Sequence, residues 1–151
     1  MTAGHDLAMA LRRAYLAMHR RSDACFAPSG VTADQFVLLS ALASGEAATQ
    51  RELARRTSSD PNTVRAMLVL LEGRGLVARG RHPTDGRALS VALTAKGRRA
   101  YERLWAQSEP VRDRLLSELR PVEVEMLIGL LGRVAATMAP GEDRLTTNAR
   151  E

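Results

Sequence analysis

The sequence is poor in cysteine, in aromatic residues and in lysine, and it contains no long apolar run. The single cysteine, Cys25, excludes an internal disulfide bond and any zinc site made of several cysteines of one chain. Aromatic residues make up only 3% of the chain, so its core must be aliphatic. No stretch approaches the roughly 18 apolar residues of a membrane span, and residues 1–10 do not form a signal-peptide pattern. These absences predict a cytoplasmic protein that does not contact membranes.

The chain has the apolar content of a folded protein and a basic charge. Its 151 residues, 45% of them hydrophobic, predict a single domain over residues 1–151. The net charge is +5, and Lys96 is the only lysine among 22 basic residues. Residues 46–97 hold nine bases and five acids, so most of the net charge lies there. This concentration is typical of a nucleic-acid-binding surface, although arginine content also follows genomic base composition.

Residues 46–97 have the pattern of a winged helix-turn-helix. A short helix is predicted over residues 51–57, followed by a break and a second helix to about Arg74, with Asp60 as N-cap and Pro61 at its first position. Strands are predicted over 76–81 and 88–93, joined by a turn containing Asp-Gly. Such a unit places its second helix in a DNA major groove.

The second helix has one apolar and one polar side. Val64, Met67, Leu68 and Leu71 recur at helical spacing and are expected to face the core. The other side carries short or polar residues near the N-terminus, as recognition helices do, because Asn and Arg bond base edges and small methyl groups meet thymine. An ordinary amphipathic surface helix has the same pattern.

The hairpin has a basic tip that suits phosphate-lined grooves, although a solvated hairpin with incidental charges is the alternative. Asp85 is expected to orient Arg87 or Arg65 through an ion pair. The predicted DNA-contacting residues are Gln50, Arg51, Ser59, Asn62, Thr63, Arg65, Ala66, Arg79, Arg81, His82 and Arg87.

Flanking helices, at about residues 5–26 and 98–138, carry wider apolar stripes than one small winged unit can cover. Thr32 and Gln35 are expected to form a capping box at the start of a helix. Thr94 is expected to cap a long helix that carries Tyr101 on its apolar stripe and is kinked at Pro110, and Pro121 is expected to open a last helix. A two-fold dimer would bury these stripes and would bind an inverted repeat. The polar segment 141–151 is predicted to be a flexible tail. The expected fold class is mainly α (α+β), a winged helix-turn-helix with flanking dimerisation helices.

The stretch GLVARGRHPTDGRALSVALTAKG resembles the wing signature of the multiple antibiotic resistance regulator (MarR) family, in which Asp-x-Arg leads through a strand into Leu-Thr-x-x-Gly. Asp85, Arg87, Leu93, Thr94 and Gly97 match this signature, and the resemblance covers about residues 7–138. It implies a dimeric DNA-binding transcriptional regulator, a repressor released by a small-molecule effector. The effector cleft would be lined by Tyr15, His19, Phe36 and Trp105, each of which is also explained as a core residue.

Other kinds of chemistry find little support in the sequence. His5, His19 and His82 lack metal-ligand spacing, and the glycines of segment 73–78 follow a helix and stop it, unlike a dinucleotide fingerprint. We therefore predict no enzyme activity, no metal and no cofactor. Two alternatives remain: a dimerisation module with a basic surface that binds no DNA, and a regulator that senses oxidants through Cys25. A structural role for Cys25 is favoured, because it lies at a helix end.

Overall fold

The structure is a computed structural model that describes residues 2–81, 84, 86 and 89–139. The chain divides into two compact units, Met1–Asp113 and Arg114–Glu151, and each is described by itself. The single domain expected from the sequence stays a prediction.

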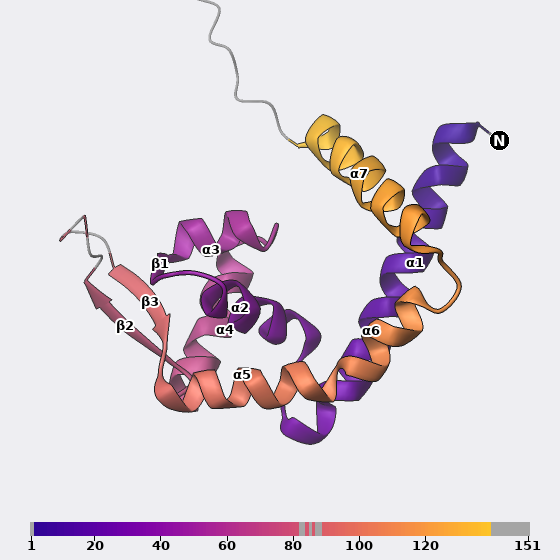
Figure 1. The fold of residues 1–151 in the computed structure, drawn as a ribbon. Helices are drawn as coiled ribbons and strands as arrows, with labels where there is room; N and C mark the ends of the chain where they lie inside the picture. The colour runs from indigo at the N-terminus through magenta and orange to yellow at the C-terminus, as the bar shows by residue number, and fades with distance from the viewer. Residues whose placement is uncertain (1, 82–83, 85, 87–88, 140–151) are drawn as a thin grey trace, which may run out of the picture. The chain divides into compact units, whose positions relative to one another are not determined.

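The first unit contains most of the helices and the sheet (Figure 1). Its elements are α1 (Ala3–Phe26), the 3-10 turn η1 (Ala27–Ser29), α2 (Ala33–Ala43), β1 (Ala48–Thr49), α3 (Gln50–Arg56), α4 (Pro61–Gly73), β2 (Val77–Arg81), β3 (Leu89–Leu93) and α5 (Ala95–Gln107). Helix α6 (Glu109–Leu116) crosses the boundary between the units, and α7 (Pro121–Met138) lies in the second. The helix–turn–helix–hairpin order of α3, α4, β2 and β3 is the predicted one, and the mainly helical fold class is confirmed.

The sheet has three antiparallel strands in the order β1–β3–β2, whereas the sequence predicted a two-stranded ribbon. The added strand pairs Ala48 with Val91 and Thr49 with Ser90. A strand of two residues is too short to show a two-residue alternation of apolar and polar side chains, so periodicity could not find it. By pairing with β3, it attaches the hairpin to the chain that leads directly into α3.

Two helix starts follow the predicted caps. Thr32 accepts a hydrogen bond from the backbone N of Gln35 at 3.1 Å, and the Gln35 side chain accepts one from the backbone N of Thr32 at 3.1 Å. This is a complete capping box at the start of α2. Thr94 caps α5 by accepting from the backbone N of Gly97 at 2.9 Å. These local bonds fix where each helix begins.

The core is aliphatic apart from one buried aromatic ring, Phe26, as the composition required. Its largest fully buried side chains are Phe26, Leu38, Leu39, Leu53, Val64, Leu68 and Leu71. These side chains come from α1, α2, α3 and α4. Helix α5 adds Ala100 and Leu104 to the same core, and the sheet adds Val77 and Val91. The apolar face predicted for residues 61–74 is therefore confirmed, with Met67 partly buried against the same core.

Gly97 marks the closest approach of α5 to the sheet. A Cβ built at this position would lie 1.9 Å from the carbonyl oxygen of Leu76, which precedes β2. The Thr94 hydroxyl, one turn earlier, also donates to the carbonyl of Gly75 at 2.6 Å. Together these contacts hold the start of α5 against the start of the hairpin.

The long helix expected after Thr94 is divided rather than kinked at Pro110. Helix α5 ends at Gln107 with Ser108 as its C-cap, and α6 starts at Glu109. Pro110 falls in the first turn of α6, where the absence of an N–H removes no helical hydrogen bond. The break therefore lies just before the proline.

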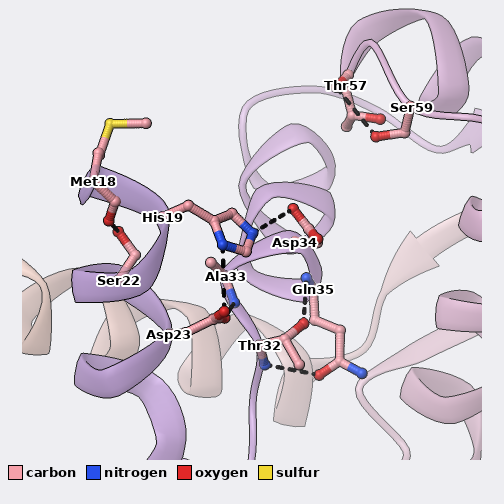
Figure 2. Close-up of polar contacts among 10 residues, drawn as sticks. All are labelled: Met18, His19, Ser22, Asp23, Thr32, Ala33, Asp34, Gln35, Thr57 and Ser59. Carbon is pink, nitrogen blue, oxygen red and sulfur yellow. Dashed lines mark hydrogen bonds and ion pairs between the residues drawn. The ribbon is translucent and has the colours of Figure 1, made fainter. Parts of the chain in front are cut away.

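Helices α1 and α2 are joined by a polar cluster around His19 (Figure 2). The imidazole Nδ1 lies 3.4 Å from a carboxylate oxygen of Asp23, and Nε2 lies 3.3 Å from one of Asp34. Asp23 also accepts a hydrogen bond from the backbone N of Ala33 at 2.7 Å. These contacts attach the C-terminal part of α1 to the first turn of α2.

In the second unit, α7 begins with Pro121 at its first position, as predicted. Glu123 accepts hydrogen bonds from the backbone N and the guanidinium of Arg120, at 2.8 and 2.7 Å. The Arg120 guanidinium holds the pKa of the Glu123 carboxyl below its usual range. The predicted tail, 141–151, lies outside the described residues.

Within the described part of the chain, no single helix is both long and apolar enough to cross a membrane, although Ala3–Ser29 and Ala33–Ala43, bent by 82°, meet the length and composition test as a pair.

Candidate nucleic-acid interface

Helix α3 and the turn after it set the position of α4. Thr49 caps α3 by accepting from the backbone N of Glu52 at 3.1 Å, and the Glu52 carboxylate accepts from the backbone N of Thr49 at 2.7 Å. In the turn, Ser58 has a φ of +51°, a left-handed conformation that few non-glycine residues adopt. The Gln50 amide then donates to the carbonyl of Pro61 at 3.3 Å, which links the first residues of the two helices.

Asp60 is the N-cap of α4, as the sequence predicted. Its carboxylate accepts from the backbone N of Thr63 at 3.0 Å and lies 3.4 Å from the Thr63 hydroxyl. An unsatisfied acid beside the proposed DNA surface would repel phosphate. Here the carboxylate is instead directed back at its own helix, where it stabilises the positive end of the dipole.

The two sides of α4 differ sharply in exposure. Val64, Leu68 and Leu71 are fully buried, whereas Asn62, Thr63, Arg65, Ala66 and Val69 are exposed. Within the described residues, the Asn62 amide and the Arg65 guanidinium have no hydrogen-bond or ion-pair partner. The structure therefore places the predicted base-contacting residues together on one exposed face near the N-terminus of a well-packed helix.

Three further residues that the sequence predicted to contact DNA lie in α3 and in the turn between α3 and α4. Arg51 is exposed on the first turn of α3, and Gln50 is half-buried because of its bond to Pro61. The Ser59 hydroxyl donates to the carbonyl of Thr57 at 3.2 Å (Figure 2), so it is engaged within the turn. Of these residues, only Arg51 extends a free charge into solvent.

The hairpin strands β2 and β3 pair from Val77–Leu93 to Arg81–Leu89. The Nε of Arg79 donates to Glu72 of α4 at 2.7 Å, so an ion pair to α4 holds the side chain of this predicted DNA-contacting residue. Arg81 is exposed, and its carbonyl accepts from the Ser90 hydroxyl at 3.2 Å. His82, Asp85 and Arg87, including the ion pair predicted for Asp85, lie outside the described residues.

The four residues predicted to line an effector cleft fall into two groups. Phe36 and Trp105 belong to a row of rings in which Phe26, Phe36, Tyr101 and Trp105 follow one another at centroid distances of 4.5, 5.8 and 6.2 Å. Tyr15 and His19 pair with each other at 5.5 Å on α1. Tyr15 and Trp105 are about half exposed, and Phe36 packs against the core. Tyr101, which the sequence prediction placed only on an apolar stripe, is the link in the row.

Cys25 has a structural partner. Its thiol donates to the carbonyl of Gln107 at 3.2 Å, and the Gln107 side-chain amide donates to the carbonyl of Cys25 at 2.5 Å. The same amide group accepts from the Ser29 hydroxyl at 3.0 Å. This arrangement joins the end of α1 to the end of α5, and it gives the thiol a packing role.

The geometry agrees with the comparisons with known proteins. Residues 29–88 match the model of the MarR family. The chain is 35% identical over 96 residues to the HTH-type transcriptional repressor Rv2887 of Mycobacterium tuberculosis, covering 64% of this chain and 69% of that protein.

Solved structures of transcriptional regulators are similar to a larger part of the chain. The transcriptional repressor CouR bound to a 23-mer DNA duplex is 34% identical, with a TM-score of 0.77 over 85% of this chain and 92% of CouR. BpsR of Bordetella bronchiseptica, whose DNA binding is regulated by 6-hydroxynicotinic acid, is 30% identical, with a TM-score of 0.77 over 89% of this chain and 93% of BpsR. A winged helix-turn-helix with these relatives identifies the protein: the chain belongs to the MarR family of transcriptional regulators.

Proposed function

We propose that this regulator is a homodimer that binds a specific operator in double-stranded DNA and represses transcription until a small molecule releases it. The observation that carries the proposal is the exposed N-terminal face of α4. There Asn62 and Arg65 have no partner within the described chain, while Val64 and Leu68 are fixed in the core. A helix that is anchored in the core on one side suits base recognition, because the exposed donors on its other side have no protein partner and are available to base edges.

In the bound state, α4 would lie in the major groove. Arg65 can form two hydrogen bonds with guanine and Asn62 can do so with adenine, while the methyl group of Ala66 can meet thymine. Arg51, at the first turn of α3, would contact the phosphate backbone beside the groove. Gln50 and Ser59 are engaged within the protein, so we assign them mainly to holding the turn.

The hairpin would contact the backbone or the adjacent minor groove through Arg81, His82 and Arg87. For Arg79 to contact a phosphate, its ion pair with Glu72 would first have to break. Because an exposed ion pair contributes only about 0–1 kcal/mol, breaking it costs little. Glu72 can therefore hold the wing against α4 in the free protein without preventing the contact.

A homodimer is supported by apolar side chains that the single chain leaves exposed. On α1 they include Leu7, Tyr15 and Met18, and on α7 they include Met126, Leu127, Ile128, Leu130 and Leu131. Burial of such surface stabilises association by about 25 cal/mol per Å² before the costs of ordering. A two-fold dimer would place two α4 helices about one DNA turn apart, which requires an inverted-repeat operator.

Release by a small molecule is supported by the related BpsR and by the partly exposed rings of this chain. We propose that Tyr15, His19, Phe36 and Trp105 contribute to an effector site. An effector shifts the equilibrium only through its differential affinity for two conformations, so it would favour a dimer whose α4 helices are wrongly spaced for the operator. The repressor would act on DNA in the cytoplasm without catalytic activity, as its relatives are regulators.

The test is titration of fluorescent duplexes from the region upstream of the gene, compared with scrambled duplexes at the same salt concentration. The wild-type protein should bind one upstream segment far more tightly than its scrambled form. Arg65→Ala should weaken binding to that segment by about 1–3 kcal/mol and binding to the scrambled duplex much less. Arg20→Ala, an exposed arginine of α1, is the charge-matched control and should change neither.

If the wild-type protein showed no preference for any upstream segment, the proposed function would be wrong. If Arg65→Ala weakened binding equally to both duplexes, Arg65 would contact phosphate and would not read bases.

A further inference from the structure

Three cations surround a small pocket on the first unit, away from the exposed face of α4. Arg74 follows α4, and Lys96 and Arg103 lie on α5, with Ser29 of η1 completing the rim. No carboxylate lines this pocket. Three positive charges without an acidic neighbour repel one another, so their arrangement needs either a structural reason or an anion.

Part of the arrangement is fixed by the backbone. The Arg74 guanidinium donates to the carbonyls of Gly30 and Ser29 at 2.6 and 3.1 Å. The Lys96 ammonium donates to the carbonyl of Arg74 at 2.9 Å. These bonds use some donors of each group and neutralise none of the charge. The Arg103 guanidinium has no hydrogen-bond or ion-pair partner within the described chain.

The floor of the pocket is apolar, formed by Val31, Leu76, Ala100 and Leu104, which are all buried. Its volume is about 110 Å³. Pockets that enclose whole drug-sized ligands measure about 300–1,000 Å³, so this one suits a single charged group. A dianion balances three cations better than a monoanion does, and cations over a low-dielectric floor attract it more strongly than in open water.

We propose that this pocket binds a phosphate group, carried by inorganic phosphate or by a small phosphorylated metabolite. The operator is the other source of phosphate, and the position of the pocket argues against it. Helix α4 rises by about 18 Å from Asn62 to Arg74, so the pocket lies at the end of the helix opposite the proposed base-contacting face. The phosphate site itself does not rest on the proposed DNA-binding function, and only the exclusion of the operator as its source rests on that function.

The experiment is an NMR titration of the full-length protein with inorganic phosphate at constant ionic strength, set with chloride. The backbone amides of Val31, Leu76 and Ala100 should shift with one saturable curve. Arg103→Gln removes the unpartnered guanidinium and should weaken binding by about tenfold or more, since a charge-assisted hydrogen bond is lost. Arg98→Gln, on the other side of the same helix, is the matched control and should leave the curve unchanged.

Two further titrations, with acetate and with an operator-length duplex, test which ligand the pocket binds. Acetate, a monoanion, should shift the same amides only at about tenfold higher concentration, and equal binding of acetate and phosphate would contradict the phosphate assignment. An operator-length duplex should leave the phosphate curve unchanged, and competition between them would assign the pocket to DNA. Shifts that do not saturate, or an Arg103→Gln variant that binds phosphate as tightly as the wild-type protein does, would overturn the proposal.

Discussion

Helices α4 and α7 are both opened by a proline and both carry a regular apolar stripe, yet they differ in what covers that stripe. Val64, Leu68 and Leu71 of α4 are fully buried by the rest of the first unit. No residue of α7 is buried, and Met126 and Leu130 keep 62% and 47% of their surface exposed.

The difference shows that an apolar periodicity predicts that a face will be covered, without predicting by what. Helix α4 is completed by its own chain, so it can present an exposed polar face in a fixed position. Helix α7 has a stripe of the same kind that remains available for a second copy of the chain.

The largest expected effect comes from placing a charge in the face of α7. Leu130→Arg would bury an unpaired guanidinium in the proposed dimer, at a cost of several kcal/mol, or at least about a hundredfold in the dimer dissociation constant. Sedimentation should show monomer or unfolded chain. Glu125→Arg, a charge change at an exposed polar position of the same helix, should leave the dimer intact. A stable dimer of the Leu130→Arg variant would place the interface elsewhere.

The next effect is expected in the covered face of α4. Leu68→Ala leaves a cavity in the core and should lower the free energy of unfolding by about 2–5 kcal/mol. Val69→Ala, the neighbouring residue with 57% of its surface exposed, should change it by less than about 0.5 kcal/mol. Chemical denaturation of both variants at one protein concentration measures the difference. Equal losses would mean that α4 is not anchored as described.

A smaller effect separates the charge of Asp60 from its capping role. Asp60→Ala should lower stability by about 1 kcal/mol, because the backbone N of Thr63 loses its acceptor. Asp60→Asn keeps an acceptor and should be nearly neutral in thermal unfolding. If Asn destabilised α4 as much as Ala does, the charge rather than the hydrogen bond would stabilise the helix start.

The smallest effect concerns the start of α7. The Arg120 guanidinium lowers the pKa of the Glu123 carboxyl, so the folded state binds the proton less readily than the unfolded state does. The contribution of this carboxylate is present above the ordinary value of about 4.3 and is lost as the pH falls through the lower folded pKa. A carboxyl NMR titration should give Glu123 a midpoint below that value, and Arg120→Ala should raise the midpoint only part of the way, because the backbone N of residue 120 still donates to the carboxylate. An unchanged midpoint in the variant would exclude Arg120 as the cause.

Local sequence signals predicted the parts of the fold that depend on neighbouring residues. The capping box of Thr32 and Gln35, the caps at Asp60 and Thr94 and the apolar side of α4 all follow from spacing along one helix. Strand β1 and the division between α5 and α6 could not be predicted in this way, because each depends on a partner or a break that periodicity does not record.

In the candidate interface, too, the features set by local spacing were predictable and the contacts between different elements were not. The exposed side of α4 was predictable from helical spacing alone. The ion pair of Arg79 with Glu72 and the engagement of Gln50 by Pro61 were not, because both join different elements of the folded unit. The cationic pocket brings Ser29, Arg74 and Arg103 together from positions far apart in the sequence, so no local pattern indicates it.

Gly97 has a consequence for how sequences of this kind can vary. Any side chain at this position would place its first carbon on the backbone oxygen of Leu76, and a backbone atom cannot move aside as a flexible side chain can. Every other amino acid at this position would therefore require the backbone of α5 or of the hairpin to shift, whereas substitution of the exposed neighbours Arg98 and Arg99 requires no such shift. A mutational tolerance profile across α5 would thus have its sharpest minimum where the helix meets the wing, and alanine, the smallest replacement, would already require that shift.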